Sequence, residues 1–220
     1  MQRPVCPLCL RPCSACWCAA VRPQVCSTEL LILQHPQEAG HAKNTALLLQ
    51  RCLPEAARIE VGELWDSATL AHWLHGDGKH SALLYPPSAP DPQLPLQPPP
   101  PLPGAWLHEP AQLRLVVLDG TWRKSRKMLY TNPLLQQLPR LALHTVPPGR
   151  YHIRKAQLPN QRSTFEACVL ALAQLGALQP AQQQQLDQAF AHWLHLQPQP
   201  GGFFAALQQK RTHPDTTGYT

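Results

Sequence analysis

The stretch LRLVVLDGTWRKSRK, residues 113–127, indicates the fold class of the whole chain. Five of its first six residues are apolar, which is typical of a strand buried on both faces of a parallel sheet. Ligands bind beyond the carboxyl ends of such strands, so Asp119 leaves the sheet where a substrate can reach it. Gly120 allows the backbone to turn, and Thr121 can cap a helix beginning at Trp122. On this pattern alone, a plain turn at Asp119 and a core position for Trp122 are equally good interpretations.

The rest of the chain alternates between strand and helix patterns, which predicts an α/β protein with a mainly parallel sheet flanked by helices. Strands are expected at residues 29–34, 57–61, 80–86, 113–118 and 140–146. Helices are expected at residues 43–53, 66–73, 122–132, 163–175 and 181–196, with a short one ending at residue 210. Residues 35–41 read as a polar loop. A metal site made of His35, Glu38 and His41 is a weak alternative, because no regular spacing brings them together.

Length and charge limit what the chain can be. Its 220 residues suffice for one sizeable core plus a small accessory module. The net charge of +6 suggests an anionic partner, of which nucleic acid is the commonest. The sequence has neither a signal-peptide core nor an apolar run of about 20 residues, so we expect a cytoplasmic protein without membrane contact.

Composition divides the chain into three parts. We expect a Cys-rich segment at residues 1–27, a main domain at 28–210 and a disordered tail at 211–220. The main domain contains an insertion, residues 86–103, in which ten of eighteen residues are proline. Proline donates no backbone hydrogen bond, so we interpret the insertion as an exposed, partly extended loop. A proline-rich ligand for an adaptor domain is the weaker alternative.

The segment CPLCLRPCSACWC, residues 6–18, holds five cysteines. Two close pairs can wrap one tetrahedral Zn²⁺, because thiolates are soft ligands and each pair contributes two vertices. We select the CxxC and CxC pairs as ligands, which are Cys6, Cys9, Cys16 and Cys18. Cys13 is then the spare cysteine. Four sulfurs close the coordination shell, so we expect a structural zinc rather than a catalytic one.

Four basic residues follow Asp119 on the expected helix: Arg123, Lys124, Arg126 and Lys127. They wrap around the helix, so some of them face solvent whatever the partner is. A solvated face and a phosphate contact both stay open as interpretations. Their place just after a strand end favours the phosphate contact.

A second basic stretch, residues 147–162, surrounds Tyr151 with positive charge, a mixture that RNA-binding loops use. It ends at Ser163, which has capping-box spacing to Glu166. The capping box explains both residues without any activity. The backbone N–H groups of a helix start can also hold a carboxylate or a phosphate, so a second role is open.

Several segments together resemble the DTW-domain family, named for an Asp-x-Thr-Trp signature that stands here at residues 119–122. The others are the CxxC and CxC cluster, QHPQE at 34–38, LLYP at 83–86, YHIRK at 151–155 and STFEA at 163–167. Their order and spacing carry the resemblance, which covers most of the chain from Cys6 to about residue 175. The proline-rich insertion and the residues after Gly176 lie outside it.

Members of this family are tRNA-uridine aminocarboxypropyltransferases. The resemblance implies transfer of the 3-amino-3-carboxypropyl group of S-adenosylmethionine to N3 of a uridine in tRNA, with release of methylthioadenosine. For the bacterial form, it places this uridine in the variable loop. It further implies a SPOUT-like α/β fold and allows a knot in the C-terminal half, which topology rules rank as rare.

Roles for single residues follow from this chemistry. The expected catalytic set is Asp119, Thr121 and Trp122: Asp119 as the base for uridine N3 or as an orienting group, Trp122 for stacking and Thr121 for the turn. The expected cofactor contacts are Leu84, Tyr85, Pro86, Leu118, Trp122, Ser163 and Thr164. The expected RNA contacts are Arg123, Lys124, Lys127, Arg150, Tyr151, Arg154 and Lys155.

Two other functions fit part of the same pattern. An RNA methyltransferase that uses S-adenosylmethionine could have a similar pocket and present the methyl carbon instead. A zinc-containing RNA-binding module without catalysis explains the charge and the cysteines but leaves Asp119 at a strand end unexplained. The sequence leaves the oligomeric state open.

Overall fold

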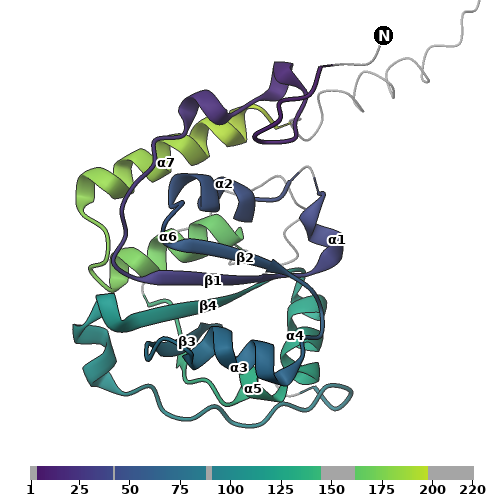
Figure 1. Cartoon of the computed structure of the whole chain (residues 1–220), viewed down its shortest axis with the longest axis vertical. Coiled ribbons are helices and arrows are strands. Elements are labelled where there is room, and N and C mark those ends of the chain that lie inside the picture. Colours follow the sequence, from purple (N-terminus) through teal and green to yellow (C-terminus); the bar gives the residue numbers. More distant parts are fainter. Residues whose placement is uncertain (1–3, 42, 88–90, 145–161, 198–220) are drawn as a thin grey trace, which may run out of the picture.

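Five parallel strands form one sheet in the order β2-β1-β4-β3-β5, with β4 at its centre (Figure 1). The computed structural model describes residues 4–41, 43–87, 91–144 and 162–197. The strands are β1 (Glu29–Gln34), β2 (Ala57–Val61), β3 (His80–Leu84), β4 (Leu113–Asp119) and β5 (Arg140–Leu141). The expected α/β class with a mainly parallel sheet is therefore confirmed.

Helices cover both faces of this sheet (Figure 1). One face carries α2 (Ala46–Cys52), α6 (Thr164–Gln174) and α7 (Pro180–His195). The other carries α3 (Ser67–His75), α4 (Trp122–Thr131) and α5 (Pro133–Gln136). The short helix α1 (Pro36–Ala39) follows β1, and four 3-10 turns complete the described elements: η1 (Cys13–Ala15), η2 (Cys18–Ala20), η3 (Gly104–His108) and η4 (Pro110–Gln112).

Successive side chains of the inner strands alternate between two cores. Leu30 of β1 and Val117 of β4 pack into the core under α2, α6 and α7, whereas Leu31 and Val116 pack into the core under α3, α4 and α5. Burying one such side chain stabilises the fold by about 1.5–3 kcal/mol. Because both faces are covered, these strands need an almost unbroken apolar run, which is the pattern that residues 113–118 show.

Most expected elements are confirmed. β1 and β2 have the expected bounds, and three helices start directly after their expected capping residues, Asp66, Thr121 and Ser163. Gly176 adopts φ 68°, a left-handed conformation that ends the α6 region as expected. In the expected apolar stripe on α3, Leu70 and Leu74 are buried, and Trp73 is partly buried.

The expected loop after β1 is wrong in part, because it contains α1. His35 caps this one-turn helix by accepting a hydrogen bond at Nδ1 from the Gln37 N–H at 3.2 Å, and Pro36 occupies its first position. The next helix, α2, begins at Ala46 rather than at residue 43. The side chain of Asn44 accepts the N–H of Ala46 at 2.9 Å, which marks that start.

The strand ends also differ from expectation. β3 stops at Leu84 instead of residue 86, since Pro86 has no N–H for the ladder. β4 runs one residue further, to Asp119, which pairs in register with Gln34. β5 covers only residues 140–141 of the expected 140–146, the last two of which lie outside the described residues.

A helix that the sequence did not predict follows α4. The chain breaks at Asn132 as expected, but it restarts at once as α5 with Pro133 in its first turn, where the missing N–H costs nothing. Other expectations fall on residues 145–161 and 198–220, outside the described ranges: the C-terminal knot, the short helix ending at residue 210 and the disordered tail. They stay predictions. None of the helices in the described ranges is long and apolar enough to span a membrane.

The N-terminal Cys-rich segment packs onto α7 and shares its core (Figure 1). Trp17 is 2% exposed and belongs to the same buried cluster as Phe190 and Trp193 of α7. Arg11 donates a hydrogen bond to Gln197 Oε1 at 3.1 Å, which ties the segment to the residues after α7. Residues of the segment therefore contribute to the core that α7 covers.

Candidate functional site

The side chain of Asp119 is held by two neighbours at the carboxyl end of β4. Gln34 Nε2 donates a hydrogen bond to Asp119 Oδ2 at 2.6 Å, and the Thr164 hydroxyl donates to Asp119 Oδ1. Asp119 is only 9% exposed. It therefore links β1, β4 and the start of α6, which a plain turn residue would not do.

Gly120 lies where α4 comes close to the end of the sheet. A Cβ added there would be 3.2 Å from Lys124 Cβ and 3.6 Å from His35 Cβ. The glycines with left-handed φ among the described residues are Gly78 and Gly176, so the turn itself does not require a glycine at position 120. The close approach of α4 is the physical reason for this glycine.

A cavity of about 510 Å³ lies between the strand ends and α6, and we call it the α6 cavity. Seven expected cofactor contacts line it: Leu84, Tyr85, Pro86, Leu118, Trp122, Ser163 and Thr164. The fold brings these residues together from separate segments of the chain. Asp119 itself does not line the α6 cavity, but its hydrogen-bond partner Thr164 does.

The hydroxyl groups at the start of α6 already have protein partners. Ser163 Oγ accepts the Glu166 N–H at 3.2 Å and donates to Glu166 Oε2 at 2.9 Å, which confirms the expected capping box. Thr164 donates its proton to Asp119, so the remaining lone pairs of the Thr164 oxygen can only accept hydrogen bonds. A ligand that meets Thr164 in the α6 cavity would therefore have to donate.

A second cavity of about 730 Å³ lies along α4, and we call it the α4 cavity. Trp122, Arg123, Arg126 and Lys127 line one side of it. The opposite side comes from the proline-rich insertion, which contributes Asp91, Gln93 and Leu94. The lining thus has three cationic side chains and one carboxylate.

Tyr85 and Trp122 line both cavities. Their rings meet edge to face, with centroids 5.7 Å apart and planes at 76°. Trp122 is 48% exposed, so its interpretation as a core residue is wrong. The two rings form the common boundary of the α4 and α6 cavities.

The expected RNA contacts divide into three groups. Arg123 and Lys127 line the α4 cavity, although Lys127 also pairs with Glu63 at 2.6 Å. Lys124 lines neither cavity and pairs instead with the buried Glu38 at 2.9 Å. The other four lie outside the described residues: Arg150, Tyr151, Arg154 and Lys155.

Two residues of the site were missing from the sequence-based assignment. Gln34 holds Asp119, and its position as the last residue of a parallel strand next to β4 was the available signal. Arg126 lines the α4 cavity, but in the sequence analysis it was only one of four basic residues and was given no role. Its spacing of four from Trp122 places both on one helix face, which would have distinguished it from Lys124.

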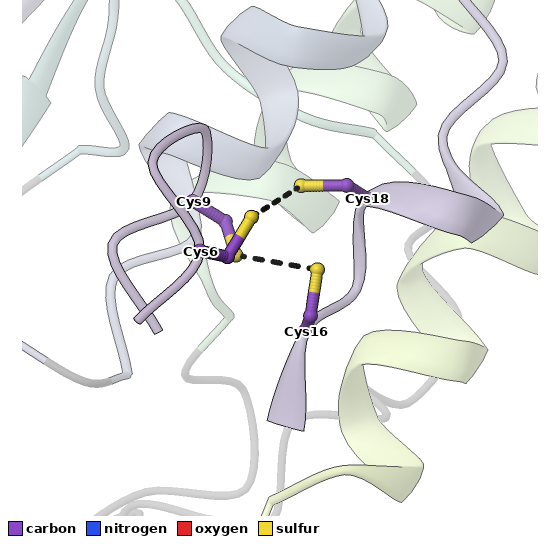
Figure 2. Close-up of side chains that lie close together, drawn as sticks. All are labelled: Cys6, Cys9, Cys16 and Cys18. Atoms are coloured by element: carbon purple, nitrogen blue, oxygen red, sulfur yellow. Dashed lines mark hydrogen bonds between the residues drawn. The ribbon is translucent and has the colours of Figure 1, made fainter. Parts of the chain in front are cut away.

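Four cysteines come together in the N-terminal segment (Figure 2). The Sγ atoms of Cys6, Cys9, Cys16 and Cys18 all lie within 4.8 Å of one another. Cys13 is exposed and outside this group. The fold therefore assembles the expected ligand set, with one pair from each of the two short motifs.

The spacing of these sulfurs fits a tetrahedral zinc ion. Zn–S bonds of about 2.3 Å place the sulfurs about 3.8 Å apart, and the Cys9–Cys16 and Cys6–Cys18 distances are 3.8 and 3.9 Å. Backbone N–H groups of Cys9 and Leu8 lower the pKa of Cys6 to about 6, whereas burial raises the pKa of Cys9 and of Cys18. A bound cation favours the thiolate form of all four, so the group can hold a metal such as zinc.

The alternative metal site in residues 35–41 is not supported. His35 Nε2 lies 3.6 Å from Glu63, and Glu38 is occupied by Lys124. His41 Nδ1 accepts a hydrogen bond from the Lys43 N–H at 3.1 Å. The three side chains thus have separate partners, and within the described ranges the group with metal-ligand geometry is the cysteine cluster.

Comparison with known proteins places these features in a family. A model of the DTW domain matches residues 3–197. The chain is 31% identical to tRNA-uridine aminocarboxypropyltransferase 2 of Drosophila melanogaster over 181 residues, which cover 79% of this chain and 67% of the fly protein. It is 30% identical to the Mus musculus protein of the same name over 179 residues, 78% of this chain and 56% of the mouse protein.

A plant relative, tRNA-uridine aminocarboxypropyltransferase A of Arabidopsis thaliana, is 28% identical over 134 residues, which cover 58% of this chain and 51% of that protein. The chain thus spans between half and two thirds of the length of these relatives. No solved structure matches it significantly. Because the domain match extends over almost the whole described part of the chain, the protein belongs to the DTW-domain family.

Proposed function

We infer that this protein is a tRNA-uridine aminocarboxypropyltransferase. It transfers the 3-amino-3-carboxypropyl group of S-adenosylmethionine to N3 of a uridine in tRNA, in the variable loop, and releases methylthioadenosine. The observation that carries this proposal is the pair of adjoining cavities at the end of β4, which share Tyr85 and Trp122. A reaction between a small cofactor and a large RNA needs two such sites side by side. The names of the relatives support the same reaction.

The α6 cavity is the proposed site of S-adenosylmethionine, which supplies a carbon atom activated by a sulfonium group. Its volume of about 510 Å³ is within the range of small-molecule sites, roughly 300–1,000 Å³. It lies at the carboxyl ends of parallel strands, where α/β proteins bind their ligands. The acceptor oxygen of Thr164 suits the ammonium group of the transferred chain, which can only donate hydrogen bonds. The SPOUT-like fold that the family resemblance implies stays a prediction.

The reaction balances without a second acid. Uridine N3–H is a weak acid, so N3 releases its proton to water and forms a bond to the activated carbon. The bond from that carbon to sulfur breaks, and its electron pair stays on sulfur, which leaves as a neutral thioether. Positioning the two reactants is therefore the main task of the protein.

For Asp119 we favour the orienting role over the role of base. Both of its carboxylate oxygens accept hydrogen bonds from protein donors, Gln34 and Thr164, and the residue lines neither cavity. A general base must be within hydrogen-bond reach of the proton that it takes. Asp119 would act by fixing Thr164 and the start of α6 against the strand ends.

The cysteine cluster is the proposed site of one structural zinc ion, held by Cys6, Cys9, Cys16 and Cys18. It would fold residues 4–20 into the form that packs onto α7. The four sulfurs close the shell, so this metal takes no part in the transfer.

The decisive experiment incubates the purified protein with unmodified tRNA and S-adenosylmethionine and analyses both products by mass spectrometry. We expect 3-(3-amino-3-carboxypropyl)uridine and methylthioadenosine in equal amounts. Methylated RNA with S-adenosylhomocysteine would instead identify a methyltransferase. RNA binding without either product, at saturating cofactor, would identify a non-catalytic module and overturn the proposal. Asp119→Ala serves as the inactive control.

A further inference from the structure

We propose that the α4 cavity binds a single unstacked nucleotide of RNA and that the proline-rich insertion is the outer wall of this nucleotide site. The inference deepens the proposed function and rests on it for the identity of the nucleotide, a uridine. It gives a role to residues 91–94 of the insertion, which the sequence analysis left without one.

The described part of the insertion is held in place on α4 and α5. Arg126 Nη2 donates a hydrogen bond to the Leu94 carbonyl at 3.0 Å, and Arg126 Nε lies 3.3 Å from the Asp91 carboxylate. The Gln97 N–H donates to Gln136 Oε1 at 2.9 Å. The described residues of the insertion form the expected, mostly exposed loop, and these contacts give the loop a defined position beside α4.

The wall is also stiff for its length. The Asp91 side chain accepts a hydrogen bond from the Gln93 N–H at 2.9 Å, and the Asp91 carbonyl accepts one from the Leu94 N–H at 3.1 Å. The two bonds form a turn around Pro92. Prolines before and after this turn restrict the backbone further. A restricted segment loses little conformational entropy when a ligand binds against it, so it suits the wall of a binding site.

The chemistry of the cavity matches a nucleotide. Trp122 offers an exposed ring on which a base can stack, and Arg123 supplies positive charge for phosphate oxygens. A volume of about 730 Å³ is within the range of roughly 300–1,000 Å³ typical of ligand sites. The boundary that Tyr85 and Trp122 form with the α6 cavity places such a base next to the proposed cofactor site.

The wall selects unpaired RNA. The cavity has α4 on one side and the insertion on the other, so a base can enter it only after leaving its stack. Nucleotides in a single-stranded loop lose the least stacking energy on entry, so they are the preferred class of substrate.

The experiment uses the full chain and two variants of the wall, with Pro100→Ala as matched control. Gln93→Trp fills the cavity without changing its charge, and Asp91→Ala removes the anchor of the wall together with its negative charge. The probes are a labelled single-stranded oligouridine and a duplex RNA of equal length, with S-adenosylmethionine titrated separately. Circular dichroism and the melting temperature check that each variant is folded.

For Gln93→Trp we expect oligouridine to bind about tenfold more weakly, because one base can no longer stack in the cavity. The Kd of S-adenosylmethionine should change less than about twofold. For Asp91→Ala the direction of the change in affinity decides. If the wall matters, loosening it weakens oligouridine binding. If the site acts by charge alone, the loss of a negative charge makes oligouridine bind more tightly. Pro100→Ala should bind like the natural chain. Unchanged affinity in Gln93→Trp, or duplex binding as tight as single-strand binding, would overturn the inference.

These binding readouts do not depend on catalysis. Should the transfer assay give no aminocarboxypropyl product while the wall variants still weaken oligouridine binding, the proposed function fails and the nucleotide site stands. The reverse result, full activity with unaffected binding in both wall variants, removes the nucleotide site and leaves the proposed function intact.

Discussion

Asp119 connects segments that lie far apart in the sequence. Its two carboxylate oxygens are held by Gln34, 85 residues earlier in the chain, and by Thr164, 45 residues later. Hydrogen bonds to a carboxylate are stronger than neutral ones, so the three side chains form a rigid connection across the strand ends. The residue that names the family signature is here placed to organise the site.

Substitution of Asp119 by Asn separates the two roles that remain for it. An amide keeps the shape, and Gln34 can turn its own amide to present the oxygen, so we expect kcat to fall by no more than about tenfold. Loss of a general base would cost about 10²–10⁴-fold. Gln34→Ala is the companion variant: the orienting role predicts a clear loss of activity, and a base role predicts almost none. Steady-state kinetics of product formation would measure both.

At the scale of elements, the zinc segment is tied to α7 through its buried side chains. Cys9 and Trp17 belong to the core that contains Phe190 and Trp193. A metal bound by the four cysteines would therefore be coupled to the packing of α7, because the same short loop serves both.

Cys9→Ser should remove about one zinc ion per chain and lower the melting temperature, because the loop loses a ligand and its buried anchor. Cys13→Ser is the matched control, since Cys13 is exposed and outside the cluster, and it should keep both zinc and stability. Atomic emission for zinc and thermal unfolding would give the result. Equal zinc content in the two variants would contradict the ligand assignment.

The opposite end of the sheet carries an ion-pair network around Arg114 of β4. Arg114 is 8% exposed, bonds Glu29 of β1 at 2.7 Å and also bonds Asp77. Lys79 bonds Glu29 at 2.6 Å. Burial raises the pKa of Glu29, but hydrogen bonds from Lys79 and Arg114 outweigh it and bring the pKa below its ordinary value.

A lowered carboxylate pKa makes stability depend on pH in a defined direction. The contribution of Glu29 is complete above its unfolded pKa of about 4.3 and is lost as the pH falls through the lower folded value. We expect the urea midpoint to fall as the pH drops from about 5 to about 2, and to fall less in Glu29→Gln. Glu55→Gln, on an exposed side chain away from the network, should follow the natural chain. An identical acid dependence in all three proteins would rule out this contribution.

At the scale of the whole molecule, the basic residues that give the net charge of +6 do not all have the same surroundings. Adjacent basic residues of α4 have different partners: Lys124 is used internally by Glu38, whereas Arg123 lines the α4 cavity. A charge that is already compensated releases few counterions when RNA binds. Position in the fold, more than total charge, decides which residues meet the phosphate backbone.

Salt dependence of tRNA binding tests this difference. Arg123→Ala should reduce the slope of log affinity against log salt by about 0.7–0.9, the value of one phosphate contact. Lys124→Ala should leave the slope almost unchanged, although it exposes the Glu38 carboxylate. Fluorescence anisotropy at several salt concentrations would measure both slopes. Equal effects of the two substitutions would show that the two side chains share one role.

The sequence by itself determined the local features of this protein. The apolar run of residues 113–118 predicted a doubly buried strand, and Asp66, Thr121 and Ser163 predicted three helix starts, because burial periodicity and capping act over a few residues. The ligand set of cysteines was readable for the same reason, since both pairs lie within thirteen residues.

Only the tertiary structure decided which distant side chains meet. Strand order brought Gln34 beside Asp119, the packing of α4 paired Lys124 with Glu38, and the return of the insertion over α4 placed Leu94 against Arg126. Helix and strand propensities contain no information on such pairs, because these contacts depend on how whole elements pack. The seven residues that we expected to contact a cofactor lie in separate segments of the sequence, and only the fold shows that they line one cavity.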